Sequence, residues 1–338
     1  MNSNILKDKK FLFIGPKTFG YETAIMSELK SMGADVIYQN DRPTEHPWGK
    51  GLLRLMPKLG WYYTDKFFLS WLNKHRSEAF DFIFIIKGEG LSPNILKTLK
   101  IYYPKIKIFF HLWDSIANAK FTHLKLPFVD DFTSFDPIDC KSIKNARYRP
   151  LFFLRNYFKL DSSANLNSTN SIFFIGTLNG DRPKIICDLL TSLHNNISFE
   201  YYLFVRSRLE LSLRKYIDPA LRKLDHSRLF FAPMKKETVV EYMQKCSAVL
   251  DIEHPNQTGL TMRTFEVLAS GKKLITTNKS IQNHDFYDPT RICIIDRHNP
   301  YIPEEFFLSK IKPLPDDFYL KYSLRGWLMD IFNVENMY

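Results

Sequence analysis

The stretch "AVLDIEHPNQTGLTMRTFEVLASGKKLITTN", residues 248–278, contains in succession the parts from which a parallel sheet is built. The apolar run 248–252 predicts a buried strand, and the polar segment 254–259 predicts a loop. Residues 260–270 follow helical spacing, and Gly271 suits the left-handed position that ends a helix. Strand, loop and helix in this order predict an α/β sheet with the loop at the carboxyl end of its strand.

Arg263 stands in the first turn of this predicted helix, where the aligned backbone dipoles already place positive charge. A cation there is mildly unfavourable unless an anion lies in front of it. Free backbone N–H groups at Gly259, Leu260 and Thr261 are suited to bind phosphate. We therefore expect an anion at this helix end.

Glu266 lies three residues after Arg263, on the same face of the helix. A surface ion pair worth a few tenths of a kcal/mol is the alternative interpretation of these two residues. The preceding loop brings His254, Gln257 and Thr258 to the same edge, which favours a ligand site.

A second segment of the same kind is "FFIGTLNGDRPK", residues 173–184. A strand ends at Gly176 and Thr177, a short loop runs to Gly180, and Arg182 begins the next helix. Two arginines in first helical turns, both following strands of one sheet, predict a diphosphate site. The alternative is that Arg182 pairs with Asp181 or faces solvent.

The strand and helix pattern extends over most of the chain, in two halves. Strands are predicted at 11–14, 35–38, 82–86 and 106–110 in the first half, and at 172–175, 201–205, 229–231, 248–252, 273–276 and 292–295 in the second. Helices are predicted at 18–32, 93–102, 181–194, 235–246 and 260–270, with a further helical region ending near Leu224. Continuous apolar strands between helices indicate parallel sheets covered on both faces.

The predicted domain boundary is the aperiodic, Ser/Asn-rich segment 156–170, "NYFKLDSSANLNSTN". It separates a first domain, 1–155, from a second domain, 171–300. Residues 301–338 are expected to form helices that pack back on the first domain. The predicted fold class is α/β, with two Rossmann-like domains facing each other across an interdomain cleft.

The net charge of +11 over 338 residues points to an acidic partner. Neither zinc-finger spacing, an aromatic RNA-binding pattern nor a basic-leucine repeat occurs, so nucleic acid is not expected. The Walker pattern is absent and the Gly176–Gly180 loop is not a dinucleotide fingerprint. Four scattered cysteines and the lack of an Asp-X-Asp loop predict that no metal is required.

The expected location is the cytoplasm, because the first residues lack a signal-peptide pattern and the apolar runs are too short to span a bilayer. Residues 48–76 interleave Lys and Arg with Trp, Tyr, Phe and Leu. This mixture suits peripheral contact with the cytoplasmic face of the inner membrane. The alternative is an amphipathic core helix with one solvated face.

These segments resemble the bacterial GT-B glycosyltransferases, in particular the CgeB-like group and related enzymes of lipopolysaccharide, O-antigen and capsule assembly. "GLTMRTFEVLASGKKLITTN" resembles their donor-site signature, and "FIGTLNGDR" resembles the opening strand and loop of their second domain. "FDFIFIIKGEGLS", "HLWDS" and "FTSFDPIDC" resemble parts of their first domain.

The resemblance implies a nucleotide diphosphate sugar as donor and a glycan or lipid-linked saccharide as acceptor, without a further cofactor. By position, Glu266 would hold the ribose hydroxyls, and Arg182 and Arg263 the diphosphate, while residues 259–261 would offer backbone contacts. A carboxylate suits a vicinal diol because it accepts two hydrogen bonds. Many retaining members carry a Glu at the position of Thr258, so the resemblance leaves the stereochemical outcome open.

Residues 15–20, 87–90 and 111–115 follow first-half strands and are expected to face the cleft. An inverting transferase needs a base within reach of the acceptor hydroxyl. The candidates are Asp114 and Glu89, with His111 third; each has the alternative role of capping the helix that follows it. The competing functions are a nucleotide-sugar epimerase of the same fold and a non-catalytic partner protein in glycan assembly.

Overall fold

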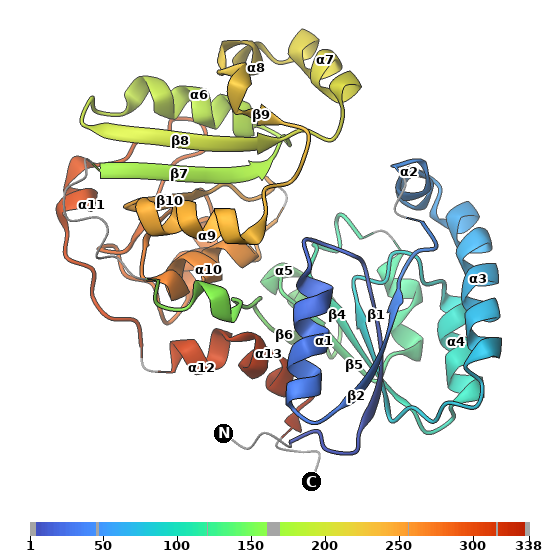
Figure 1. The fold of residues 1–338 in the computed structure, drawn as a ribbon. Helices are drawn as coiled ribbons and strands as arrows, with labels where there is room; N and C mark the ends of the chain where they lie inside the picture. The colour runs from blue at the N-terminus through green and yellow to red at the C-terminus, as the bar shows by residue number, and fades with distance from the viewer. Residues whose placement is uncertain are drawn as a thin grey trace. The chain divides into compact units, whose positions relative to one another are not determined.

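The computed structural model describes residues 5–44, 47–119, 121–160, 170–255, 257–315 and 317–334. Residues 161–169, most of the predicted linker, lie outside the described residues. The described chain divides into two compact units, and Figure 1 shows a sheet with flanking helices in each. The first unit comprises the described residues up to Leu151 together with those from Leu324 onward, and the second comprises Phe152–Ser323.

Within the described residues, the first unit contains one six-stranded sheet with the strand order β2-β1-β3-β4-β5-β6 and parallel pairing throughout. Its strands are almost continuously apolar at the centre, as burial on both faces requires. They are β1 (Lys10–Gly15), β2 (Asp35–Asn40), β3 (Phe82–Ile86), β4 (Lys107–Leu112), β5 (Asp131–Ser134) and β6 (Arg147–Tyr148).

The helices of the first unit cover both faces of this sheet. They are α1 (Tyr21–Ser31), α2 (Pro47–Leu55), α3 (Pro57–Lys74), α4 (Pro93–Tyr102), α5 (Pro137–Ser142) and α13 (Leu324–Ile331). The chain proceeds from β1 to β2 in one direction and from β3 to β6 in the other. Because crossovers between parallel strands are right-handed, α1 and α4 lie on opposite faces, as Figure 1 shows.

The last described helix, α13, packs on the first unit. Trp327 is fully buried, with its ring 5.9 Å from that of Phe84. Asp330 accepts a hydrogen bond from Arg147 at 3.1 Å and forms an ion pair with the buried Arg149 at 2.7 Å. These contacts tie α13 to β3 and to the β6 end of the sheet.

Within the described residues, the second unit also contains one six-stranded parallel sheet, with the order β12-β11-β10-β7-β8-β9. Its strands are β7 (Asn170–Thr177), β8 (Ile197–Phe204), β9 (Leu229–Phe230), β10 (Ala248–Asp251), β11 (Lys273–Thr276) and β12 (Ile292–Ile294). Its helices are α6 (Arg182–Ser192), α7 (Arg208–Ile217), α8 (Pro219–Lys223), α9 (Lys236–Lys245), α10 (Met262–Ser270), α11 (Glu304–Leu308) and α12 (Phe318–Tyr322).

The two parallel α/β sheets predicted from the sequence are confirmed. The predicted strands of both halves are present, with ends shifted by a few residues. Two strands were not predicted: β5, with the sequence DFTS, and β6, with the sequence RY. Both are short and carry polar residues, so they lack the apolar run on which the other predictions rested.

Residues 48–76 form α2 and α3. One face of α3 is core, since Trp61, Phe68 and Leu72 are buried, which confirms the alternative interpretation for that face. The other face exposes Leu59, Tyr62 and other large side chains. Among the helices of the described residues, none is both long and apolar enough to cross a bilayer.

A close backbone approach fixes the loops after β2 and β3. A Cβ atom at Gly90 would lie 1.7 Å from the carbonyl oxygen of Asp41, and a backbone atom cannot rotate away.

We predict that Gly90→Ala lowers the free energy of unfolding by about 3 kcal/mol or more. The matched control is Gly51→Ala in α2, where a Cβ meets nothing within 4 Å and a gain of up to about 1 kcal/mol is expected. Urea denaturation measures both, and equal stability of Gly90→Ala and the wild-type protein would contradict this packing.

Candidate functional site

In each sheet, one pair of neighbouring strands divides the strand order: from one strand of the pair the chain continues to one edge of the sheet, and from the other strand it continues to the opposite edge. In the second unit, β7 and β10 are neighbours, and the chain proceeds from β7 to one edge and from β10 to the other. The loops that follow two such strands diverge, which leaves a crevice at their carboxyl ends, where open α/β sheets bind ligands. Both segments with a first-turn arginine follow these two strands.

The guanidinium of Arg182 joins the ends of β7 and β10. It donates from Nε and Nη2 to the carbonyl oxygen of Ile252, at 3.0 and 2.6 Å, and from Nη1 to that of Thr177, at 2.8 Å. Gly176 makes room for it, because a Cβ there would lie 3.2 Å from Nη1 and 2.8 Å from the ring of Phe174. Burial lowers the pKa of Arg182.

The predicted phosphate contact of Arg182 does not fit this geometry. Its guanidinium is directed at backbone carbonyl groups, which the sequence could not reveal. Asp181, the alternative partner, accepts a hydrogen bond from Arg297 at 2.7 Å and acts on Arg182 through its charge. We conclude that Arg182 positions the two strand ends.

Arg297, which follows β12, was not predicted to belong to the site. Its Nη2 donates to the carbonyl oxygen and to Oε1 of Glu253, at 2.7 and 2.8 Å, and its Nη1 reaches Asp181. Glu253 is buried and also accepts a hydrogen bond from Thr277. Burial raises the pKa of the Glu253 carboxyl. Arg297 therefore connects the loops after β7, β10 and β11.

The N-terminus of α10 is anchored to the end of β10 by Asp251. The Oδ2 atom of this buried carboxylate accepts hydrogen bonds from the hydroxyls of Thr261, at 2.6 Å, and Thr264, at 2.9 Å. Thr261 is the N-cap of α10 and accepts from the N–H of Thr264. The first-turn N–H groups of a helix lack intrahelical acceptors, and this anchor fixes the helix end that carries them beside the end of β10.

The loop before α10 is held by its own amides and by the segment after β11. Gln257 donates to the carbonyl oxygen of Gly259 at 2.8 Å, and Ser280 donates to that of Thr258 at 2.6 Å. Leu260 is buried as a whole residue, and so is Gly259. His254 is exposed at the start of the loop.

Arg263 and Glu266 form an ion pair, with 2.9 Å between Nη1 and Oε2. The pair is not on the surface, since only 20% of the Arg263 side chain and 1% of the Glu266 side chain are exposed. The guanidinium lies 6.0 Å from the ring centroid of Tyr157, and its Nη1 contacts the sulfur of Met243 at 3.5 Å. The nearest described anion to the first-turn cation is thus Glu266 itself.

In the first unit the direction of strand addition reverses between β1 and β3, and charged residues gather at the ends of β2, β3 and β4. Lys87 lies 3.2 Å from Oε1 of Glu89 and 3.1 Å from Oδ2 of Asp114, so the two predicted bases share one cation. Lys87 has a left-handed backbone, with φ 63°, which turns the chain at the end of β3. Glu89 also pairs with Arg42 at 3.4 Å.

The alternative capping roles of these carboxylates do not hold. Ser92, not Glu89, caps α4 by accepting from the N–H of Ile95. Asp114 is followed by turns up to Ala119, and its Oδ1 accepts from the side-chain amide of Asn118 at 3.2 Å. Its side chain is 29% exposed, against 14% for Glu89.

Two buried charges lie beneath this cluster. Asp41 accepts from the N–H of Glu89 at 3.0 Å and from Arg42 at 3.1 Å, and burial raises its pKa. Lys125 donates to the carbonyl oxygen of Gly88 at 2.5 Å, and burial lowers its pKa to about 8. The cluster thus places basic and acidic groups close together, which keeps the loop after β3 in one conformation.

The prediction of His111 as a third base does not fit the structure. The imidazole is fully buried, donates to or accepts from the Thr133 hydroxyl at 2.8 Å through Nδ1, and packs edge-on against Trp327 of α13. Burial lowers its pKa to about 3, and Arg149 and Arg147 act in the same direction. A buried, neutral core histidine cannot accept a proton from an acceptor substrate.

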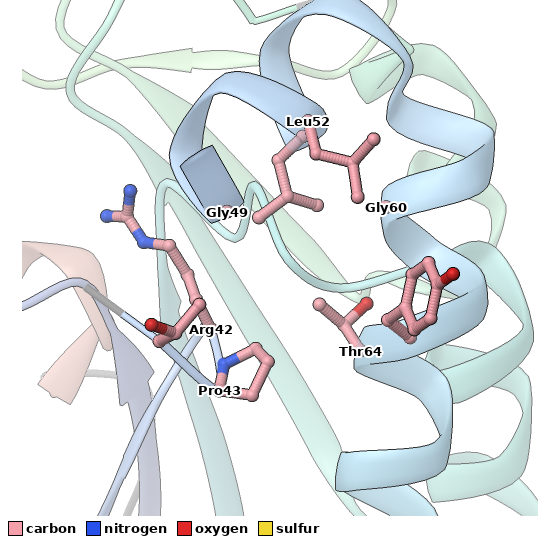
Figure 2. Close-up of a pocket in the computed structure, with 9 residues that line it drawn as sticks. Arg42, Pro43, Gly49, Leu52, Gly60 and Thr64 are labelled. Carbon is pink, nitrogen blue, oxygen red and sulfur yellow. The ribbon is translucent and has the colours of Figure 1, made fainter. Parts of the chain in front are cut away.

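A small pocket adjoins Arg42 on the side of α2 and α3 (Figure 2). Figure 2 shows Gly49 and Leu52 of α2 across from Arg42 and Pro43, with Gly60 and Thr64 on α3. Its lining consists of Arg42, Pro43, Thr44, Gly49, Leu52, Leu53, Gly60, Tyr63 and Thr64. At about 40 Å³ it has room for about three water molecules, so it cannot enclose a whole sugar.

Among the described residues, no group of three or more His, Cys, Asp or Glu side chains is placed to hold a metal ion. That no metal is required stays a prediction.

The chain matches no protein-family model and no curated protein sequence. It is similar in structure to the lipopolysaccharide outer core galactosyltransferase WaaB in its apo form, with a TM-score of 0.53 and 12% identity over 96% of this chain and 99% of that one. It is also similar to Anabaena HepE in complex with UDP and glucose, with a TM-score of 0.60 and 12% identity over 98% and 100% of the two chains.

A third similar structure is the UDP-GlcNAc 2-epimerase of Methanocaldococcus jannaschii in complex with UDP-GlcNAc and UDP. Its TM-score is 0.54, with 11% identity over 96% of this chain and 99% of that one. At these identities the likeness establishes the fold, which is GT-B over the full length of the chain.

The buried His111 generates a pH prediction. The unfolded state binds a proton below about 6.5 and the folded state only below about 3, so between these values the unfolded state holds more protons. The stability from this group is complete above pH 6.5 and is lost as the pH falls. We predict that His111→Asn, which retains a polar atom near Nδ1, reduces the slope of the unfolding free energy in this window by up to about 1.4 kcal/mol per pH unit.

Urea denaturation across the window measures this slope, and the exposed His226→Asn serves as the control. A His111→Asn slope equal to that of the wild-type protein would show that the imidazole titrates normally in the folded state.

Proposed function

We propose that this protein is a glycosyltransferase, hexosyl or related, that moves a sugar from a nucleotide diphosphate donor to a cell-surface glycan. The observation that carries the proposal is the anchored N-terminus of α10 at the reversal point of the second sheet. Solved structures of the same fold support it, because HepE was solved with UDP and WaaB is a galactosyltransferase.

The diphosphate is proposed to bind at the backbone of Gly259, Leu260 and Thr261. Asp251 fixes this helix end through two threonine hydroxyls, so its N–H groups are oriented before the ligand arrives. A preorganised dipole stabilises the charge that develops on the leaving diphosphate and requires no metal. The end of β7 at Gly176 and Thr177 and the loop with His254 and Gln257 are proposed to border the same site.

Arg263 is proposed as the side-chain cation of the diphosphate site. Its guanidinium is partly exposed in the first turn of α10, and Glu266 holds it there. The ribose contact predicted for Glu266 needs a side chain that a ligand can reach, yet this one is 99% buried. We therefore assign Glu266 the role of positioning Arg263.

Asp114 is the proposed general base for the acceptor hydroxyl. It is the more exposed of the two carboxylates that share Lys87, and Lys87 is its cationic neighbour at 3.1 Å. Glu89 forms ion pairs with both Lys87 and Arg42, which makes it less able to accept a proton from a substrate. Arg182 and Arg297 are proposed to position the loops of the donor site.

The acceptor is proposed to be lipopolysaccharide core, O-antigen or capsule, in line with the CgeB-like resemblance of the sequence. WaaB, whose substrate belongs to lipopolysaccharide, supports this class. A position at the cytoplasmic face of the inner membrane is proposed from α2 and α3, where Leu55, Met56 and Tyr63 are 84%, 57% and 55% exposed.

The second candidate is a nucleotide-sugar epimerase, favoured by the likeness to the Methanocaldococcus epimerase. Such an enzyme binds the same kind of donor but needs no acceptor. Incubation with a bound donor and no acceptor separates the two functions, because only an epimerase converts the sugar. The non-catalytic alternative predicts neither conversion nor transfer.

Donor binding tests the assignment of Arg263. Arg263→Ala is predicted to weaken the affinity for the preferred nucleotide sugar about tenfold or more, since a charge-assisted hydrogen bond is lost. Glu266→Gln, which keeps the shape but removes the charge, is predicted to have a smaller effect in the same direction. Isothermal titration calorimetry with uridine, guanosine, cytidine and thymidine diphosphate sugars measures both.

The control is Lys184→Gln, which breaks an exposed ion pair with Asp188 on α6 of the same unit. If Arg263→Ala, shown to be folded by circular dichroism, binds the donor as the control does, Arg263 is not part of the donor site.

The assignment of Asp114 predicts a rate effect without a binding effect. Asp114→Asn should lower kcat by about a hundredfold or more while the donor Kd stays unchanged, because only proton removal is lost. Glu89→Gln should cost less, and His111→Asn should retain kcat. A larger kcat loss in Glu89→Gln than in Asp114→Asn would reverse the assignment.

A further inference from the structure

Helix α7 of the second unit presents an apolar stripe to solvent. Leu209, Leu213, Tyr216 and Ile217 are 78%, 71%, 87% and 75% exposed. Their spacing of four, seven and eight residues from Leu209 places them along one face of the helix. Isolated exposed apolar residues are ordinary, but four on one helical face form a contiguous patch that marks an interaction surface.

The stripe faces outward because the opposite side of α7 is attached to the unit. Leu211 packs against the core of the second unit, and Leu221 of α8 is fully buried in the same core. Figure 1 shows α7 at the periphery of the unit, near the edge strand β9. The packing of α7 therefore holds the stripe in this orientation.

The helix is also formed in advance of any partner. Ser207 caps it by accepting from the N–H of Glu210 at 3.1 Å, and Glu210 reaches back to the N–H of Arg206 at 3.2 Å. This reciprocal arrangement resembles a capping box and stabilises the first turn. Binding of a partner to α7 therefore costs little free energy for helix formation.

Cations border the stripe. Arg206 is half exposed, and Arg208 lies with its guanidinium 5.8 Å from the ring centroid of the exposed Phe231. Lys215, four residues after the core-facing Leu211, contacts Nδ1 of His226 at 3.2 Å instead. Between Arg206 and Arg228 the chain has seven Lys and Arg residues against three Asp and Glu. Two of the acids, Asp218 and Asp225, cap the short helices that follow.

We propose that α7 docks on an anionic lipid bilayer, with Leu209, Leu213, Tyr216 and Ile217 in the interface and the bordering cations at the lipid headgroups. An apolar face edged by Lys and Arg is the pattern of helices that lie in the plane of a membrane surface. The excess of positive charge opposes a second copy as occupant, because symmetric pairing would bring like charges together. This inference is independent of the donor and of the reaction.

Vesicle co-sedimentation of the full chain tests the proposal. The wild-type protein is expected to bind vesicles of phosphatidylglycerol mixed with phosphatidylcholine at least several-fold more strongly than phosphatidylcholine alone. Leu213→Ser combined with Tyr216→Ser should reduce partitioning about tenfold or more. Arg206→Gln combined with Arg208→Gln should reduce it about fivefold per cation, and added salt should weaken the remaining binding.

The matched control is Leu308→Ser combined with Leu320→Ser, which removes two leucines that are 74% and 54% exposed elsewhere on the second unit. Circular dichroism and nucleotide-sugar affinity, measured on each variant without lipid, separate loss of docking from loss of fold or of the donor site.

The proposal is overturned if the wild-type protein does not bind anionic vesicles, or if the α7 variants bind them as the control does. It is also overturned if the wild-type protein is a dimer in lipid-free buffer and the α7 substitutions dissociate it, since a second copy then covers the stripe. Sedimentation velocity gives this last result.

Discussion

The bond from the Arg182 guanidinium to the carbonyl oxygens of Ile252 and Thr177 is the interaction on which the second unit's site depends. The loops that follow the neighbouring strands β7 and β10 run in opposite directions along the sheet. The carbonyl groups at the ends of these two strands therefore lack partners within the sheet. A buried carbonyl without a hydrogen bond is costly, and a guanidinium with several donors satisfies two strand ends at once. Asp251 and Arg297 then fix the α10 end and the adjoining loops to the same point.

In the first unit, the loops at the corresponding strand ends are held by different interactions. Its reversal point lies between β1 and β3, and the loop after β3 is fixed by Asp41 and Lys125 from below and by the close approach at Gly90. Lys87 then holds Glu89 and Asp114 as a pair of carboxylates. The second unit thus presents an ordered helix N-terminus suited to an anion, and the first unit presents carboxylates suited to proton transfer. The proposed reaction requires both of these groups.

The sequence predicted the fold well because long apolar strands and capped helices leave local signals, as at β3 and α10. It missed β5 and β6, which lack an apolar run and are joined instead by the bonds from Arg147 of β6 to Asp131 of β5 and to Asp330 of α13. The loops after β7 and β10 were predicted from the strand ends, but the directions of their side chains were not. Arg182 turns inward to carbonyl groups, His111 is core, and Arg297 lies 44 residues from Glu253 in a segment without a motif. The exposed apolar face of α7 was also missed, because apolar residues at helical spacing ordinarily indicate the buried face of a helix.

The central claim is that a nucleoside diphosphate binds at the carboxyl ends of β7 and β10, against the N-terminus of α10. The most direct measurement is a crystal structure of the protein with UDP, the nucleotide present in the HepE structure. The account predicts density for the diphosphate within hydrogen-bonding distance of the backbone N–H groups of residues 259–261, with the Arg182 bonds to Thr177 and Ile252 intact. Density for the nucleotide at another place, with none at this helix end, would contradict it.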